Sequence, residues 1–485
     1  MPIDTVALVG VLEDLVGEPL DTDQIEAWLE STEDAVNDPF VSIRLGPTYK
    51  VAIGDDGAFS IAGLPAGGIY RLKVTYLPRT GANVRTWTSN WVQLLDDADL
   101  SDPTLEAVTP TAVEITTSTY QTGTTVANRR GLAPWLAALA NRDNAPAKIM
   151  VMGDSTMHYG AASWAQTTVE RLRALLQAKY PTTGVAVPGA GYVPAYKFLS
   201  PTLPGVQSGG TGYSTGAGLG MEHYNLHNPG TAQYRELVID GDSVRVWYGK
   251  SNYLVHQGIV SIDGVDQAAL NSQNGISYPP QVDSDGHYQD YSFTAGAHTI
   301  RVRGVSGLAF ILDGIEVFNG DKTKGIHVYN GARSGGKASQ YAGAAADRHW
   351  EIAAVIKPQL WVLALGINDE LDGDAAAYLA DLDTILDTKI PAAMGTDPYS
   401  VLLVGQYRPS RAVDTALWTA MQSGLKARAA GNVAMLDVGA LWPLPLEADG
   451  STSYGLMSEA TDPLHPSTLG HELQAQVVAD AIGFI

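Results

Sequence analysis

Five apolar runs between residue 146 and the C-terminal end constrain the fold of this chain more than any other feature. Each run ends in a short loop of glycine and polar residues, and amphipathic segments follow several of them. Strands that are apolar throughout are buried on both faces, as in a parallel sheet covered by helices. The pattern therefore predicts an α/β fold with a parallel sheet between helices. The runs are AKIMVMG (147–153), IHVYN (326–330), QLWVLAL (359–365), SVLLVG (400–405) and VAMLDV (433–438).

Two further stretches have the alternating apolar and polar pattern of antiparallel strands. Residues 1–100 consist of short strand-like segments separated by turns and predict an N-terminal β-sandwich. Residues 101–145 are rich in Thr, Ser and Pro and predict a linker with a short helix. Residues 205–322 predict an inserted, jelly-roll-like β-sandwich that splits the α/β domain into 146–204 and 323–485.

Composition excludes several classes of function. With 30 basic and 52 acidic residues the net charge is -22, which repels nucleic acid, so we expect no nucleic-acid partner. Cysteine is absent, which removes disulfides, thiolate metal sites and cysteine nucleophiles. His223, His227 and His256 lack the spacing of metal ligands, so we assign no metal and no cofactor. The first twenty residues predict neither a secretion signal nor a membrane span.

Ser155 follows the first apolar run within the sequence GDST. Ligands bind outside the carboxyl ends of the strands in open parallel sheets, so this serine is a candidate nucleophile. The alternative is a helix N-cap, which is the commoner role of a serine in this position.

Asp462 and His465 precede the last amphipathic segment within TDPLHPST. An imidazole held beside a carboxylate could take the Ser155 proton and return it to a leaving group. The alternative is a capping loop stiffened by Pro463 and Pro466.

Asn368 follows the third run in LALGINDE, and its side-chain amide could donate to an oxyanion. The loop after the second run, NGARSGG (330–336), could bring backbone amides close to a substrate. Together with Ser155 and the Asp462–His465 pair, these segments form four weak signals in a consistent order.

The four segments resemble the blocks of the SGNH (GDSL-like) hydrolase superfamily over residues 146–204 and 323–485. The Ser block matches VMGDST, the Asn block matches Gly366 to Asp369, and the D-x-x-H block matches Asp462 to His465. The glycine block departs from the family pattern N-x-G-x-S-G, because Ala332 stands at the position assigned to the oxyanion hole. Gly331 remains the alternative donor.

This resemblance implies an SGNH-type α/β/α sandwich with a five-stranded parallel sheet and hydrolysis of an ester through an acyl-enzyme. Ser155 would be the nucleophile, with Asp462 and His465 as its partners. The oxyanion donors would be the Ser155 N–H, the Asn368 side chain and the N–H of Ala332 or Gly331. We expect His158 and His471 to be structural.

The appended β-modules suggest where such an enzyme would act. Trp247, Tyr248, Tyr253 and Tyr288 of the insert could be platforms for sugars, although most aromatic residues of a sandwich lie in its core. We therefore expect an esterase that removes acyl groups, including O-acetyl groups, from a glycan or glycolipid of a bacterial envelope. The architecture also resembles bacteriophage tail or minor tail proteins, which predicts a place in the virion tail, other tail proteins as partners and a homotrimer.

Two alternatives remain open at this point. The first is a lipase-like enzyme or thioesterase that acts on longer acyl chains. The second is a receptor-binding tail protein that uses the SGNH fold only as a scaffold. Retention of Ser155, Asn368, Asp462 and His465 together argues against the second.

Overall fold

The computed structural model divides the chain into two compact units, Met1–Gly123 and Thr124–Ile485. In the first unit it describes the backbone of the strands alone. In the second unit it describes residues 126–157, 161, 163–195, 205–208, 213–215, 218–227, 234–250, 257–271, 284–305, 309–408, 414–439, 456–459 and 462–483.

The described strands of the first unit form two small sheets, as a β-sandwich requires. Whether the two sheets pack face to face stays a prediction, because the side chains lie outside the described part of the chain. One sheet has the order β4 (Ala58–Pro65), β1 (Thr5–Val11), β8 (Ala98–Asp99). The other has the order β3 (Tyr49–Val51), β2 (Ile25–Ser31), β5 (Ile69–Tyr76), β6 (Arg85–Thr88), with β7 (Val92–Gln93) also paired to β5.

The five apolar runs form five parallel strands, which confirms the predicted sheet. All four pairings between neighbours are parallel. In spatial order the strands are β20 (Gly325–Asn330), β9 (Pro146–Gly153), β21 (Leu360–Ala364), β22 (Ser400–Gly405) and β23 (Val433–Asp437).

The strand order creates a binding position at one edge of the sheet. Of the five parallel strands, the first in the chain, β9, lies between the second, β20, and the third, β21. The chain therefore leaves β9 toward one side and later crosses to the other. Open α/β sheets bind ligands where the order reverses in this way, outside the carboxyl ends of the strands.

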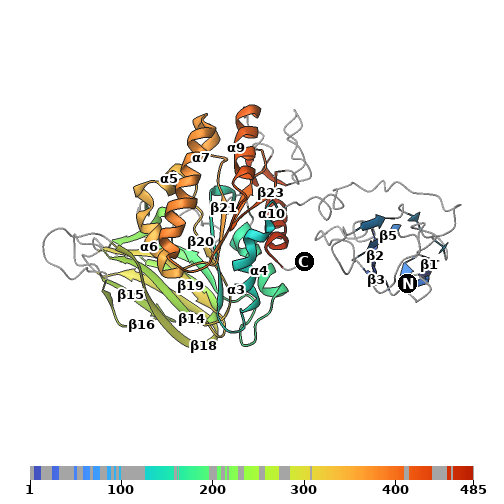
Figure 1. Ribbon diagram of the computed structural model, residues 1–485. Coiled ribbons are helices and arrows are strands. Elements are labelled where there is room, and N and C mark those ends of the chain that lie inside the picture. Colours follow the sequence, from blue (N-terminus) through green and yellow to red (C-terminus); the bar gives the residue numbers. More distant parts are fainter. Residues whose placement is uncertain are drawn as a thin grey trace. The chain divides into compact units, whose positions relative to one another are not determined.

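Helices cover both faces of the parallel sheet, as Figure 1 shows. Val151 of β9 faces α4 (Thr168–Lys179) and α10 (Thr468–Ile482), which line one side of the sheet. Its neighbours Met150 and Met152 belong to the core on the opposite side. That core is completed by apolar residues of α6 (Asp347–Ile356), α7 (Ala375–Thr384), α8 (Ile390–Met394) and α9 (Thr415–Ala427).

The alternation of side chains along β9 explains why helices cover both faces of the sheet, which gives three layers. Successive side chains of a strand point to opposite faces, so an uninterrupted apolar strand needs a cover on each side.

The short helix α3 (Ala133–Ala140), expected within the linker, is also present. The Trp135 indole N–H donates to the Ile482 carbonyl oxygen at 2.8 Å. This bond ties the start of the second unit to the end of α10.

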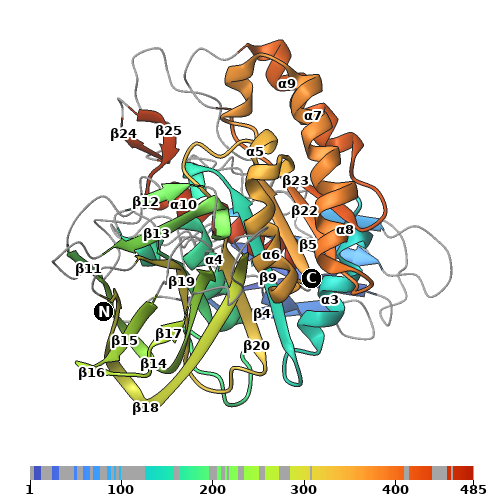
Figure 2. The same cartoon turned by 90° about the vertical axis from the view of Figure 1, so that its left-hand side faces the viewer.

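The insert adds antiparallel strands to the same sheet. β10 (Gly191–Pro194) pairs parallel with β20 and antiparallel with β19 (Ala309–Phe318). The long strands β14 (Tyr234–Lys250) and β18 (Ser284–Gly304) then pair side by side (Figure 2). The remaining strands are β11 (Gly205–Ser208), β12 (Tyr213–Thr215), β13 (Glu222–His227), β15 (Gln257–Ile262), β16 (Val265–Asp266) and β17 (Leu270–Asn271).

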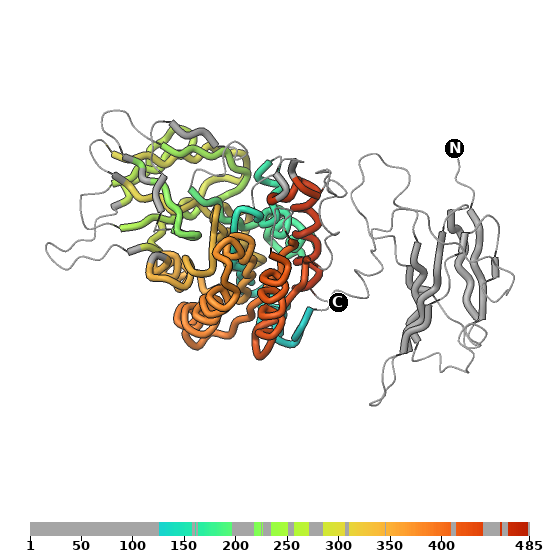
Figure 3. Tube along the Cα trace, turned by 90° about the horizontal axis from the view of Figure 1, so that it is seen from above, coloured from blue at the N-terminus to red at the C-terminus, as the bar shows by residue number. Residues whose placement is uncertain are grey.

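The insert nevertheless has a core of its own. Val244 and Val246 of β14 pack there with Ile300 of β18 and Phe310 of β19, and all four are buried. Figure 3 shows its green and yellow strands gathered on one side of the orange and red segments. The insert thus has a second hydrophobic core, and its strands continue the parallel sheet without a break in the hydrogen-bonded pairing. No described helix combines the length and the apolar character needed to cross a membrane.

Leu403 at the centre of β22 provides a test of this packing. Its side chain is fully buried, and Leu403→Ala should lower the free energy of unfolding by about 2–5 kcal/mol through lost contacts and the cavity left behind. Val355→Ala on α6 is the control, because Val355 is 47% exposed and the change should stay within about 0.5 kcal/mol. Urea denaturation followed by circular dichroism would measure both, and equal losses would contradict the assigned core.

Candidate active site

The turn after β9 holds Ser155 at the edge of the sheet. Asp154 is fully buried, and its Oδ1 atom accepts hydrogen bonds from the Thr156 N–H at 2.9 Å and from the Thr156 hydroxyl at 2.7 Å. A short 3-10 helix, η4 (Ser155–Met157), follows directly. The Asp154 side chain thus fixes the backbone on both sides of Ser155. Ser155 itself is only 6% exposed.

His465 meets Ser155 across the fold. It lies on β25 (Asp462–Pro466), which pairs with β24 (Met457–Glu459) immediately before α10. The His465 Nε2 atom lies 2.9 Å from the Ser155 Oγ atom, although the two residues are 310 positions apart in the chain. This is the separation of a nucleophile from its general base. The side chain of Asp462 lies outside the described residues.

Asn368 lies at the same edge of the sheet, after the neighbouring strand. It follows β21, and Gly366 before it has φ 134, a conformation that favours glycine. The Asn368 Nδ2 atom donates to the Gly336 carbonyl oxygen at 3.2 Å. The amide has two hydrogens, and this bond uses one of them.

The backbone amides of the glycine block take part in other hydrogen bonds. The Gly331 N–H donates to the Val151 carbonyl oxygen at 2.8 Å, and the Ala332 N–H donates to Asn330 Oδ1 at 3.0 Å. The Arg333 N–H donates to the Gly153 carbonyl oxygen at 3.1 Å. The Gly331 and Arg333 amides therefore hold the loop against β9, while the Ala332 amide bonds within the loop itself.

Gly335 differs from the residues before it in this loop. It has φ 67 and is exposed, and no atom lies within 4 Å of the place where a Cβ would be. Its neighbour Gly336 has its carbonyl oxygen bound to Asn368. The loop thus connects the Gly153 end of β9 with the Asn368 turn.

Sequence reasoning missed two residues of this site, Gln406 and Tyr407. Both follow β22 at the carboxyl edge of the sheet, and each is only 1% exposed. Gln406 bonds to the turns that carry Ser155 and Asn368, and the Tyr407 hydroxyl donates to the Leu464 carbonyl oxygen at 2.7 Å. Their position just after a parallel strand was the signal, the same one that indicated Ser155 and Asn368.

Two buried carboxyl groups shape the electrostatics of this edge. Burial raises the pKa of Asp154, while hydrogen bonds from Thr156 and Gln406 act in the opposite direction. Burial also raises the pKa of Asp369 to about 7, against the hydrogen bond that its Oδ1 atom accepts from the Ala338 N–H at 2.8 Å. Asp369 adjoins Asn368 and caps the N-terminus of α5 (Ala338–Ala342).

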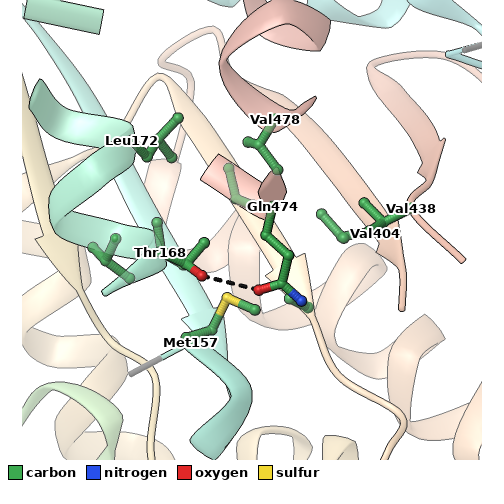
Figure 4. Close-up of a pocket in the computed structure, with 11 residues that line it drawn as sticks. Met157, Thr168, Leu172, Val404, Val438, Gln474 and Val478 are labelled. Carbon is green, nitrogen blue, oxygen red and sulfur yellow. Dashed lines mark hydrogen bonds between the residues drawn. The ribbon is translucent and has the colours of Figure 1, made fainter. Parts of the chain in front are cut away.

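A small apolar cavity lies beneath the Ser155 turn, between the sheet and helices α4 and α10 (Figure 4). Met157 contributes to its lining, beside the hydrogen bond from the Thr168 hydroxyl to Gln474 Oε1. The space amounts to about 10 Å³, room for about one water molecule. His471 next to it is fully buried and contacts Thr168 through Nδ1, which agrees with the structural role expected for it.

The aromatic residues singled out in the insert divide between core and surface. Trp247 is 1% exposed and belongs to the core, so it offers no platform for a sugar. Tyr288 is 43% exposed, and the Arg245 guanidinium lies 3.9 Å from the centre of its ring. Tyr248 contacts Phe310, and Tyr253 lies outside the described residues, as does His158.

A peptidoglycan O-acetylesterase of known structure superimposes on this chain with a TM-score of 0.51. The two chains share a fold. The alignment covers 73% of this chain and 97% of the esterase at 19% sequence identity. The shared fold is an α/β fold built on a parallel sheet, and sheets of this kind bind ligands outside the carboxyl ends of their strands.

Two other solved structures show weaker similarity. A family two carbohydrate esterase from Clostridium thermocellum matches 57% of this chain and 96% of its own, with 12% identity and a TM-score of 0.26. A salicylyl-acyltransferase from a tetracycline biosynthetic pathway matches 61% and 94%, with 13% identity and a TM-score of 0.25. No protein-family model matches the sequence. No curated protein matches it either.

The pKa of Asp369 predicts a specific pH dependence of stability. An unfolded aspartate has a pKa near 3.8, so between about pH 4 and pH 7 the folded chain keeps a proton that the unfolded chain has lost. The free energy of unfolding should therefore fall as the pH rises through this window.

Asp369→Asn cannot ionise but keeps an oxygen for the Ala338 N–H. We expect it to exceed the parent in stability at pH 8 by on the order of a few kcal/mol and to equal it near pH 4. Thermal unfolding at both pH values measures this, and a variant less stable than the parent at pH 8 would contradict the assignment.

Proposed function

We propose that this chain is a serine ester hydrolase in which Ser155 is the nucleophile and His465 the general base. The observation that carries the proposal is the 2.9 Å contact between His465 Nε2 and Ser155 Oγ at the carboxyl edge of the parallel sheet. A serine hydroxyl is a weak nucleophile until a base takes its proton. The contact provides that base in the position where the fold binds ligands.

The first half of the reaction forms an acyl-enzyme. Ser155 Oγ attacks the ester carbonyl carbon while its proton passes to His465 Nε2. The tetrahedral intermediate then collapses, the bond to the alcohol oxygen breaks, and His465 returns the proton to the departing alcohol. In this scheme the Asp462 carboxylate accepts a hydrogen bond from His465 Nδ1–H, which orients the ring and stabilises the imidazolium.

The second half repeats these steps with water. His465 takes a proton from the water, whose oxygen attacks the acyl carbon bound to Ser155. The bond to Ser155 Oγ breaks, the serine regains its proton from His465, and the carboxylic acid leaves. No group beyond the chain's own side chains and water enters this balance.

The oxyanion of both intermediates needs donors that are fixed before the reaction. We assign the Ser155 N–H and the second N–H of the Asn368 amide to this role. For a third donor we propose the Gly335 N–H in place of Ala332 or Gly331, because those two amides already donate to Asn330 and Val151.

We further propose that the ester is an acyl group, such as O-acetyl, on a carbohydrate or glycolipid of a bacterial envelope. A solved structure with the same fold carries the name peptidoglycan O-acetylesterase. Tyr288 of the insert is 43% exposed, although Arg245 and Trp247 both contact its ring, and its exposed part is the one aromatic contact that we propose for a sugar.

The N-terminal β-module and the Thr-rich stretch after it motivate a proposal for the biological setting. We propose a bacteriophage tail or minor tail protein that acts on the host envelope as a homotrimer among other tail proteins. Light scattering on the purified chain measures the oligomeric state, and a monomer would remove this part of the proposal.

Hydrolysis of p-nitrophenyl esters of increasing acyl length tests the chemistry. We expect turnover of the acetate ester, a decline with chain length, and loss of about 1,000-fold or more in kcat for Ser155→Ala, because the nucleophile is gone. The rate of p-nitrophenol release measures each case.

Ser400→Ala is the matched control. Ser400 is as buried as Ser155 but lies at the amino end of β22, where its hydroxyl accepts from the Trp135 N–H at 3.1 Å. Its kcat should equal that of the parent. Equal activity of the parent and Ser155→Ala would rule out the proposed enzyme, and a preference for long acyl chains would favour the lipase-like alternative.

A further inference from the structure

We propose that Gln406 and Tyr407 are positioning residues that together align the nucleophile, the oxyanion donor and the general base. The inference rests on the proposed function and adds the residues that hold the reacting groups in position. The two residues are adjacent at the carboxyl end of β22, and each is 1% exposed. Neither carries a charge.

Gln406 bonds to the turn after β9 and to the end of β21, the two strands that follow one another on one side of β22. Its Nε2 atom donates to the Thr156 hydroxyl at 3.0 Å and to Asp154 Oδ2 at 3.3 Å, which are the neighbours of Ser155 on either side. The same nitrogen lies 3.2 Å from the Ala364 carbonyl oxygen at the end of β21. One buried amide thus connects the Ser155 turn to the next strand.

The oxygen of the same side chain holds the Asn368 turn. Gln406 Oε1 accepts a hydrogen bond from the Ile367 N–H at 3.2 Å, one residue before Asn368. Because the donor and acceptor ends of one planar amide are at a fixed distance, the two turns are held at a fixed separation. That separation decides whether an oxyanion formed at Ser155 meets the Asn368 amide.

Tyr407 extends the connection to the histidine strand. Its hydroxyl donates to the Leu464 carbonyl oxygen at 2.7 Å, one residue before His465. Successive residues direct their side chains to opposite sides of an extended backbone. The pair can therefore reach toward the Ser155 and Asn368 turns on one side and β25 on the other.

A purely structural role for Gln406 can be separated from positioning by a second glutamine in the same sheet. Gln359 also connects β9 with β21, since its Oε1 atom accepts from the Lys148 N–H at 2.8 Å. It lies at the amino ends of the strands, opposite the site. Loss of this bond should weaken the sheet without moving the reacting groups.

The experiment compares Gln406→Met, Tyr407→Phe and Gln359→Met in the full chain with p-nitrophenyl acetate. We expect kcat to fall about 10–100-fold in Gln406→Met and less in Tyr407→Phe, with KM within about threefold, because misplacement of reacting groups raises the barrier more than it weakens binding. Gln359→Met should keep the parent kcat. Thermal unfolding monitors stability in parallel.

The outcomes separate this inference from the proposed function. An inactive parent chain would overturn the proposed function and the inference with it. An active parent with an unchanged kcat in folded Gln406→Met would overturn the inference alone. Equal losses of kcat in Gln406→Met and Gln359→Met would also overturn it, since a general loss of stability would then explain both. If Gln406→Met does not fold, Tyr407→Phe, which removes a single hydroxyl, takes its place. A lower kcat in that variant would support the inference, and an unchanged kcat would overturn it.

Discussion

Parallel pairing of five strands directs their carboxyl ends to one edge of the sheet, and the part of the candidate site that His465 meets depends on that constraint. Ser155 follows β9, Asn368 follows β21, and Gln406 follows β22. None of these residues is near another in the chain. Their proximity results from the register in which the strands pair.

The buried polar groups at this edge illustrate a second constraint. A carboxyl group taken out of water is costly unless donors meet it, and Asp154 has donors from Thr156 and Gln406. Asp369 has one donor for Oδ1, and its pKa rises to about 7 as a result of burial. The network that orders the Ser155 turn is therefore also the one that satisfies its buried acid.

Much of the fold could be predicted from the sequence because its strongest signals are local. An apolar run such as SVLLVG has few alternatives to a buried parallel strand, and the five runs became β9 and β20 to β23. Motif order then placed Ser155 and His465 at one edge, where their side chains lie within hydrogen-bonding distance. These inferences needed only periodicity, the order of the motifs and the rule that ligands bind at the carboxyl ends of parallel strands.

What the sequence did not predict depends on backbone geometry and long-range contacts. Gly331 and Ala332 stood at plausible positions for oxyanion donors, but their amides bond to Val151 and Asn330, which no spacing rule reveals. Gln406 carries no motif, and its importance follows from four distances between separate loops. Likewise, the sequence placed Trp247 on a strand of the insert but did not show which face of that strand lies in the core, where Trp247 is buried.

The ladder through β10 and β19 ties the insert to the parallel sheet in a way that limits how the chain can be altered. Deleting the insert would remove β19 and turn β10 into an edge strand whose groups on that side have no partners. Such a bare strand recruits other chains, so aggregation is the expected fate of the shortened protein. The insert is therefore not an interchangeable cassette, because its strands also complete the edge of the parallel sheet.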